Sequence, residues 1–109
     1  MHKMIVMAKA AEGRKEELAR WYDERHLNDL LAVPGLVSVE RHDMITVKQP
    51  DGLPQWDFMM IYEYAGDPFD TLRTMPPMGS EKMPTSDALE SVSTLSVIGM
   101  SHGRRESAD

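Results

Sequence analysis

The sequence contains no cysteine, few aromatic residues and no excess of basic side chains. Without cysteine there is no disulfide, cysteine-ligated zinc site, iron–sulfur cluster or thiol nucleophile. Lys and Arg number 12 against 18 Asp and Glu, a net charge of −6, so the chain lacks the cationic excess that displaces counterions from nucleic acid. No apolar run approaches the ~20 residues of a membrane span, and residues 1–11 lack the long apolar segment of a signal peptide. We therefore expect a cytoplasmic protein that binds neither nucleic acid nor membranes.

The length of 109 residues predicts one domain built on a single hydrophobic core. We place this domain at residues 1–101, followed by a polar C-terminal tail at 102–109 that the fold does not need. Ten methionines are present, and methionine suits both core gaps and adaptable binding surfaces. Proline and glycine cluster at 50–54 and 76–84, which marks loops.

Hydrophobic patterning predicts four strands and two helices along the chain. The strands are expected at 3–9, 36–47, 55–64 and 91–100. A long helix begins near 12–13 and ends at Val33, because Pro34-Gly35 stops it. A short helix at 67–75 has Asp67 as its cap and Phe69, Leu72 and Met75 as its apolar face. Residues 75–86 form a long loop, either a lid over a site or a floppy excursion.

The order β-α-β-β-α-β is typical of an α+β, ferredoxin-like fold, with a four-stranded antiparallel sheet and both helices on one face. The third strand carries large apolar side chains on both faces, although the helices cover only one. An exposed apolar sheet face of this size is unusual in a monomer. We therefore expect a homodimer in which the sheets of two copies pack against each other.

A histidine lies near the middle of the apolar side of the long helix. With Leu18 at 0° and ~100° per residue, the wheel puts Tyr22 at about 40°, His26 at about 80° and Leu30 at about 120°, with Asp23 on the shoulder of this face and Trp21 outside it. Asp23 is three residues from His26, a spacing at which a carboxylate orients an imidazole and raises its basicity. These residues indicate acid–base chemistry by His26, oriented by Asp23 and assisted by Tyr22. The alternative is a buried structural histidine.

Further candidates for ligand binding lie on the strands and the helix. They are Leu30, His42, Trp56, Phe58, Met60 and Tyr62, with either face of the third strand directed at the helix. A metal site needs three or four converging ligands, and no such group is present in the pattern. The sequence also lacks a glycine-rich phosphate loop and the motifs of serine hydrolases or zinc proteases. We expect no metal and no cofactor.

The stretch 20–41, with W-Y-D-E-R-H followed by D-L-L-A-V-P-G and a strand, resembles the dimeric α/β-barrel superfamily, and most of all its EthD-like branch. The resemblance implies a homodimer with a ligand cavity between the sheet and the helices, and a functional histidine at His26. Members of the superfamily include cofactor-free monooxygenases, polyketide cyclases, muconolactone isomerases, haem-degrading enzymes and aldoxime dehydratases. Haem-binding branches use a histidine late in the chain, and residues 75–86 contain none.

These observations support three functions. The first is a cofactor-independent isomerase, cyclase or lyase of aromatic or polyketide-type metabolism, acting by proton transfer through His26. The second is a binding or stress-related dimer without catalysis, and the third is a cofactor-free monooxygenase. A cavity of a few hundred Å³ that contains His26 favours an enzyme, whereas a filled helix–sheet interface favours the second function.

Overall fold

A single antiparallel sheet organises the computed structural model, which describes residues 1–103, 107 and 108. The strands are β1 (His2–Ala8), β2 (Leu36–Asp43), β3 (Phe58–Tyr64) and β4 (Leu95–Gly99), in the order β2-β3-β1-β4. Every neighbouring pair is antiparallel, and β1 is central, since it pairs with β3 on one edge and with β4 on the other. The predicted α+β, ferredoxin-like class is confirmed. The predicted tail at 102–109 lies partly outside the described residues, so its role stays a prediction.

The first helical segment is continuous but not uniform. It consists of α1 (Lys15–Trp21), a five-residue π-helical turn η1 (Tyr22–His26) and α2 (Leu27–Leu31). It begins later than predicted because Gly13 has a φ of +76°, which makes a turn before the helix. α2 ends at Leu31, two residues before the predicted Val33, and Ala32 still has helical backbone angles. The helical wheel used for the sequence assumes a rotation of 100° per residue along the whole helix. The π turn has a smaller rotation per residue, so the wheel does not hold across Tyr22–His26.

The short helix α3 (Pro68–Thr74) begins as predicted. The Asp67 side chain accepts a hydrogen bond from the Phe69 backbone nitrogen at 2.9 Å, and Pro68 occupies the first turn. Its predicted apolar face is wrong at Phe69, which is 50% exposed. The buried residues are Pro68 and Thr71, three positions apart. They face inward because Thr71 packs directly against the backbone of Gly35.

The loop between β2 and β3 is longer than the sequence indicated. β2 ends at Asp43 rather than residue 47, and β3 begins at Phe58 rather than residue 55. The last bond between the two segments runs from the Met44 nitrogen to the Asp57 oxygen at 3.0 Å, and beyond it the segments separate. Ile45 and Val47 are almost fully exposed, and the prolines and glycine at 50–54 cannot continue the ladder.

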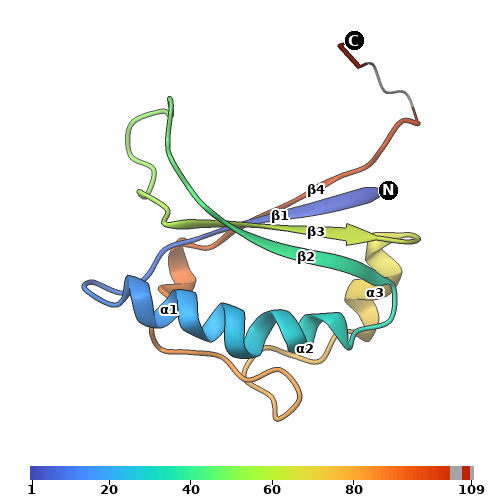
Figure 1. Ribbon diagram of the computed structural model, residues 1–109, viewed down its shortest axis with the longest axis horizontal. Coiled ribbons are helices and arrows are strands. Elements are labelled where there is room, and N and C mark those ends of the chain that lie inside the picture. The colour runs from blue at the N-terminus through green and yellow to red at the C-terminus, as the bar shows by residue number, and fades with distance from the viewer. Residues whose placement is uncertain (104–106, 109) are drawn as a thin grey trace.

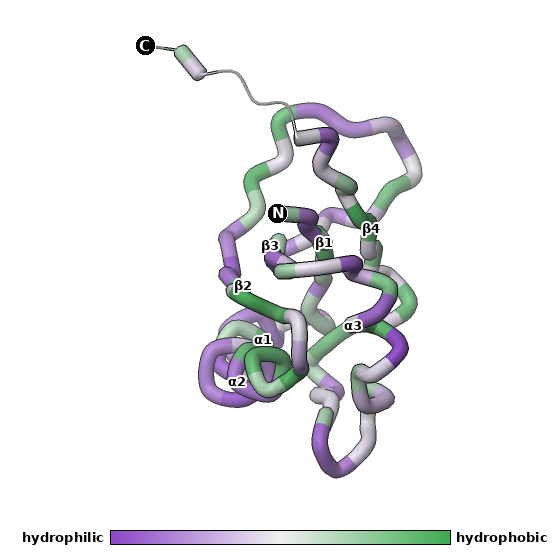
Figure 2. The backbone as a smooth tube through the Cα atoms, turned by 90° about the vertical axis from the view of Figure 1, so that its right-hand side faces the viewer, coloured by the Kyte–Doolittle hydropathy of each residue, from purple (hydrophilic) through white to green (hydrophobic). Residues whose placement is uncertain are grey.

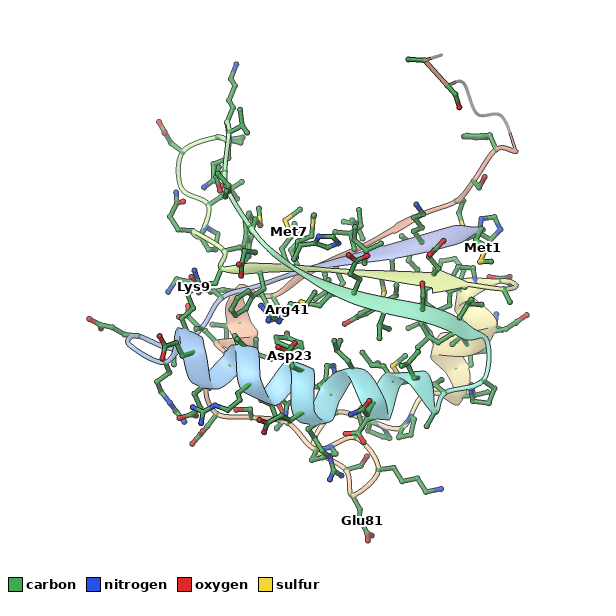
Figure 3. All side chains as sticks on the ribbon, in the orientation of Figure 1. Met1, Met7, Lys9, Asp23, Arg41 and Glu81 are labelled. Atoms are coloured by element: carbon green, nitrogen blue, oxygen red, sulfur yellow. The ribbon has the colours of Figure 1, made fainter. Side chains whose placement is uncertain are left out.

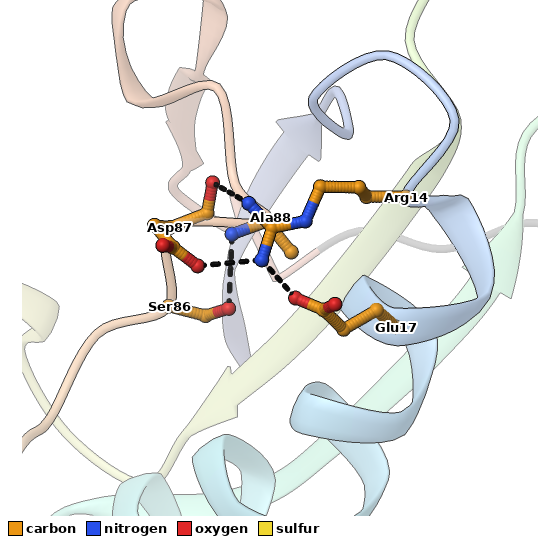
Figure 4. A network of polar contacts seen from close by, with 5 residues as sticks. All are labelled: Arg14, Glu17, Ser86, Asp87 and Ala88. Atoms are coloured by element: carbon orange, nitrogen blue, oxygen red, sulfur yellow. Dashed lines mark hydrogen bonds and ion pairs between the residues drawn. The ribbon is translucent and has the colours of Figure 1, made fainter.

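A polar clasp holds the segment that returns to β4 against the start of α1 (Figure 4). The Arg14 guanidinium donates to the Asp87 carboxylate at 2.6 Å and to its backbone oxygen at 3.1 Å, and also pairs with Glu17. Backbone bonds continue the contact, from the Ala11 nitrogen to the Ala88 oxygen at 2.7 Å and from the Glu90 nitrogen to the Lys9 oxygen at 2.9 Å. Residues 87–90 are therefore held against residues 9–14 at the start of the helix.

All the α-helices lie on one side of the sheet (Figure 1), and the view turned by 90° shows the same arrangement, with α1 and α2 directing hydrophilic residues outward (Figure 2). The aromatic face of β3 looks at the helices, because every second residue from Phe58 to Tyr64 is buried. The opposite, open face of the sheet carries the alternate residues of the paired strands. Its apolar members are Ile5, Met7, Met59, Ile61, Leu95 and Val97. Among the described residues, no helix is long and apolar enough to cross a membrane.

Candidate functional site

A cavity of about 160 Å³ lies between the helical segment and the sheet. The helix supplies Trp21, Tyr22, His26 and Leu30; the strands supply Met4, Val6, Tyr62 and Ser96; and the connecting segments supply Met75, Met78, Leu89 and Thr94. The lining is apolar except for the imidazole, two phenols and two hydroxyl groups. The volume is smaller than the few hundred Å³ typical of drug-sized ligands, but it suffices for a molecule with one ring.

His26 lies in the wall of this cavity and is only 6% exposed. Its imidazole stacks on the Trp21 indole, with ring centroids 4.5 Å apart and planes 15° from parallel. The imidazole also meets the Tyr22 ring edge-on, with ring centroids 5.5 Å apart. The Nδ1 atom is buried without a hydrogen-bond partner among the described residues. Because burial penalises the charged form, the pKa of His26 falls to about 4, although Asp29 acts in the opposite direction. At neutral pH the imidazole is therefore uncharged.

The π turn explains why Trp21 belongs to the site. In a π-helical turn the hydrogen bonds run from residue i to i+5, so side chains five positions apart come onto one face, whereas in an α-helix they diverge. Trp21 and His26 are five apart and meet face to face. The uniform wheel had placed Trp21 outside the apolar face. Sequence periodicity missed it because nothing in the pattern marks a single widened turn.

Two phenols stand beside the imidazole. Tyr22 and Tyr62 are 2% and 3% exposed and both line the cavity. Burial raises the pKa of Tyr22, and burial together with the neighbouring Tyr22 and Tyr64 raises the pKa of Tyr62. Both side chains stay protonated at any physiological pH. They are suited to donate a hydrogen bond to a ligand oxygen, and not to act as bases.

Asp23 does not orient His26, which corrects the sequence-based expectation. Its carboxylate receives two hydrogen bonds from the Arg41 guanidinium of β2, at 2.9 and 2.8 Å, and Figure 3 shows the two side chains meeting between helix and sheet. This pairing lowers the pKa of Asp23 and raises that of Arg41. The three-residue spacing holds for an α-helix, and the π turn rotates Asp23 away from the imidazole. The pair ties the helix to the sheet.

Four other predicted ligand-binding residues lie outside the cavity. Phe58 and Met60 are buried in the core, where the rings of Phe58 and Tyr22 meet edge-on with their centroids 6.4 Å apart. Trp56 precedes β3 and donates from Nε1 to the Ser93 oxygen at 2.7 Å. His42 lies on the open face of the sheet, 3.5 Å from Glu40. Of the predicted site residues, the structure thus brings together Tyr22, His26, Leu30 and Tyr62.

The loop after α3 supplies one wall of the cavity, a role that the sequence alone did not decide. Met75 and Met78 line the cavity, while Met83 is fully buried and anchors the loop. Backbone bonds from Gly79 to Met83 at 2.8 Å and from Ser80 to Pro77 at 3.1 Å fold it into a compact turn. The loop therefore covers the cavity. The signal for this role was its cluster of methionines and prolines. The strand residues Met4 and Val6 were also missed, although the alternation of β1 marks them as inward-facing.

Among residues 1–103, 107 and 108 there is no group of three or more potential metal ligands. The polar groups of the cavity are one imidazole and several hydroxyls. They can bind and orient a small organic molecule and exchange a proton with it.

Comparison with known proteins identifies the fold. No protein-family model matches the sequence, and no curated protein matches it. Among solved structures, the chain is similar to an ethyl tert-butyl ether D (EthD) family protein from Bacillus halodurans. The identity is 16% and the TM-score 0.53, over 93% of this chain and 99% of the other. The chain therefore has an EthD-like fold, in agreement with the resemblance of residues 20–41.

Proposed function

We propose, starting from the EthD-like fold, that the cavity binds a small, largely apolar molecule with one ring, and that His26 exchanges a proton with it without a cofactor. One observation carries the proposal. A buried imidazole lines an apolar cavity, and its Nδ1 atom has no hydrogen-bond partner among the described residues. A buried polar atom without a partner costs free energy, and a ligand hydrogen-bonded there recovers part of it.

The chemistry that fits these groups is proton abstraction next to a carbonyl. The uncharged imidazole accepts the proton from carbon, and the electron pair of the broken C–H bond moves onto the carbonyl oxygen. A phenol of Tyr22 or Tyr62 donates a hydrogen bond to the oxygen as its negative charge develops. Return of the proton to another carbon completes an isomerisation. Attack of the carbanion on a second carbonyl carbon gives an alkoxide, and return of the proton from the imidazolium to that oxygen completes a cyclisation.

A second candidate function is binding without catalysis. The low pKa of His26, about 4, favours it, because a base is most effective when its pKa lies near the working pH. The two functions differ in what the ligand does to His26. A substrate that develops negative charge beside the imidazole raises its pKa, whereas a passive apolar ligand excludes water and leaves it low.

The test compares His26→Gln with the control His102→Gln, at an exposed position after β4. Catalysis predicts that His26→Gln loses turnover by about 10²–10⁴-fold while His102→Gln keeps it, with a ring-sized ketone as the probe. Oxygen consumption during turnover identifies the monooxygenase. If His26→Gln melts early and still binds the probe like the wild type, His26 is structural and the proposal fails.

We also propose that the functional unit is a homodimer. The open face presents six apolar side chains at its centre, with Lys3, Glu40 and Glu63 around them. Such a patch favours a partner that presents equally apolar surface, and a second copy of the same face satisfies this by two-fold symmetry.

A further inference from the structure

A second concave surface lies between the helical segment and the loop that follows α3. This outer groove has a volume of about 440 Å³ and is lined by residues that include Arg25, Asp29, Val33, Thr74, Pro76 and Lys82. The groove and the cavity share their walls. Arg25 and Asp29 each precede a cavity residue, His26 and Leu30, and Thr74 and Pro76 alternate with the cavity residue Met75.

The segment from Met75 to Met78 contributes to both spaces, because Met75 and Met78 line the cavity and Pro76 lines the groove. Methionine is unbranched and flexible, and its side chain repacks easily around a ligand. The segment is held at its ends by α3 and by the buried Met83, and Pro76 and Pro77 restrict its backbone, so any adjustment falls on the methionine side chains.

The groove is cationic although the chain carries a net charge of −6. Arg25 donates from Nε to Asp29 at 3.0 Å, and neither of its Nη atoms has a hydrogen-bond partner among the described residues. Lys82, on the opposite wall, forms no ion pair with any described residue. Two cations against one carboxylate leave one positive charge, which matches a monoanion. A dianion meets the repulsion of Asp29.

We propose, as an extension of the proposed function, that cavity and groove form one ligand site for an apolar ring bearing a carboxylate. The ring lies beside His26 and Tyr62, and the carboxylate lies between Arg25 and Lys82. Because these cations come from the helix and from the loop, the ligand's carboxylate also draws the loop toward the helix and closes the cavity.

The experiment uses two matched probes, 3-phenylpropionate and the uncharged 3-phenylpropan-1-ol, with calorimetry on the full chain. The alcohol measures the cavity alone, and the difference between the probes measures the groove. We expect the acid to bind at least about tenfold more tightly, since hydrogen bonds to charged groups outweigh neutral ones. Lys82→Met is expected to remove most of this difference and leave the alcohol unchanged. The control Lys48→Met, in the exposed loop between β2 and β3, is expected to change neither probe.

The outcomes separate the two proposals. If both probes bind the wild type equally, or if Lys82→Met weakens acid and alcohol alike, the groove is not a carboxylate site, while alcohol binding still supports the cavity. If neither probe binds at millimolar concentration, the cavity is not a ring site, and the proposed function falls with the extension. Added salt is expected to weaken the acid only.

Discussion

His26 remains uncharged in the folded chain at pH values where an ordinary histidine is protonated. Its pKa falls from 6.5 to about 4 on burial, and the unfolded chain binds the proton first. As the pH falls from about 6.5 to about 4, the unfolded state gains this proton while the folded state does not, so the free energy of unfolding decreases. Above that window His26 contributes no pH dependence, and below it both states are protonated.

The predicted size of this effect is on the order of 3 kcal/mol at most. Urea unfolding at about pH 7 and about pH 4.5 measures it, with His26→Gln as the reference that removes the titrating group and leaves the carboxylates in place. We expect the wild type to lose more stability than the variant between the two pH values. Equal losses contradict the burial of a neutral imidazole.

Trp21 holds the His26 ring by stacking, since the imidazole has no hydrogen bond at Nδ1 among the described residues. Trp21→Leu is expected to free the ring and to lower stability by about 0.5–1.5 kcal/mol from the aromatic pair, besides the lost packing. Trp21→Phe keeps a stacking partner and is the matched control. Proton NMR reads the ring directly, because the indole shifts the imidazole protons upfield and Trp21→Leu abolishes that shift. An unchanged imidazole spectrum in Trp21→Leu means that the rings do not stack in solution.

Single residues were predictable where one rule governed them. The helical period placed Tyr22, His26 and Leu30 on the inner face, and all three line the cavity. It misplaced Trp21 and Asp23, because a π turn changes the angle between neighbours without leaving a mark in the pattern.

At the scale of elements, the junction between α2 and β2 depends on Gly35. Its φ is +94°, and a Cβ atom there collides with Thr71 of α3. Gly35→Ala is expected to cost roughly 1–2 kcal/mol of backbone strain plus the steric conflict with Thr71.

Gly52→Ala separates the two terms, because Gly52 has a φ of +87° and no atom near its virtual Cβ. In thermal denaturation, Gly35→Ala is expected to have a clearly lower melting temperature than Gly52→Ala. The double variant Gly35→Ala/Thr71→Ala is expected to recover part of the difference. Similar melting temperatures for the two glycine variants mean that α3 moves aside without cost.

Elements were predictable in kind and order, and less so in extent. Periodicity found all four strands, but β2, β3 and β4 are shorter than predicted. In β2 the alternation continues through Ile45 and Val47 after the hydrogen bonds to β3 have ended, and before β4 the residues Ser91–Ser93 form a 3-10 turn. The predicted face of α3 was right at Leu72 and Met75, which pack against the core, and wrong at Phe69, because seven residues hold too few turns to fix the face from the pattern. The close packing of Thr71 on Gly35 fixed it instead.

At the scale of the whole molecule, the open face of the sheet predicts association. Sedimentation at micromolar concentration is expected to give a dimer whose interface exceeds ~1,000 Å². Ile61→Lys places a charge at the centre of that face and is expected to give monomers. Val92→Lys, at a site 92% exposed outside the strands, is expected to leave the dimer intact. A monomeric wild type, or dissociation by both variants, contradicts sheet-to-sheet packing.

The topology followed from the sequence because the β-α-β-β-α-β order admits few arrangements. The cavity could be predicted only in part from the sequence, since its lining also depends on the position of the long loop after α3. Met75 and Met78 reach the cavity through long-range packing around the buried Met83, and local propensity does not encode such packing.

The central position of β1 has a consequence for synthesis of the chain. β1 is the first strand to leave the ribosome, yet one of its edges waits for β4, the last strand of the sheet. Until then the nascent chain presents an unpaired central strand, which is an edge open to foreign strands. The residues that close the cavity from that end, Leu89, Thr94 and Ser96, emerge in the same final stretch. Sheet and cavity are thus completed together once β4 has been made, so a chain that stops before β4 cannot close the cavity around a ligand.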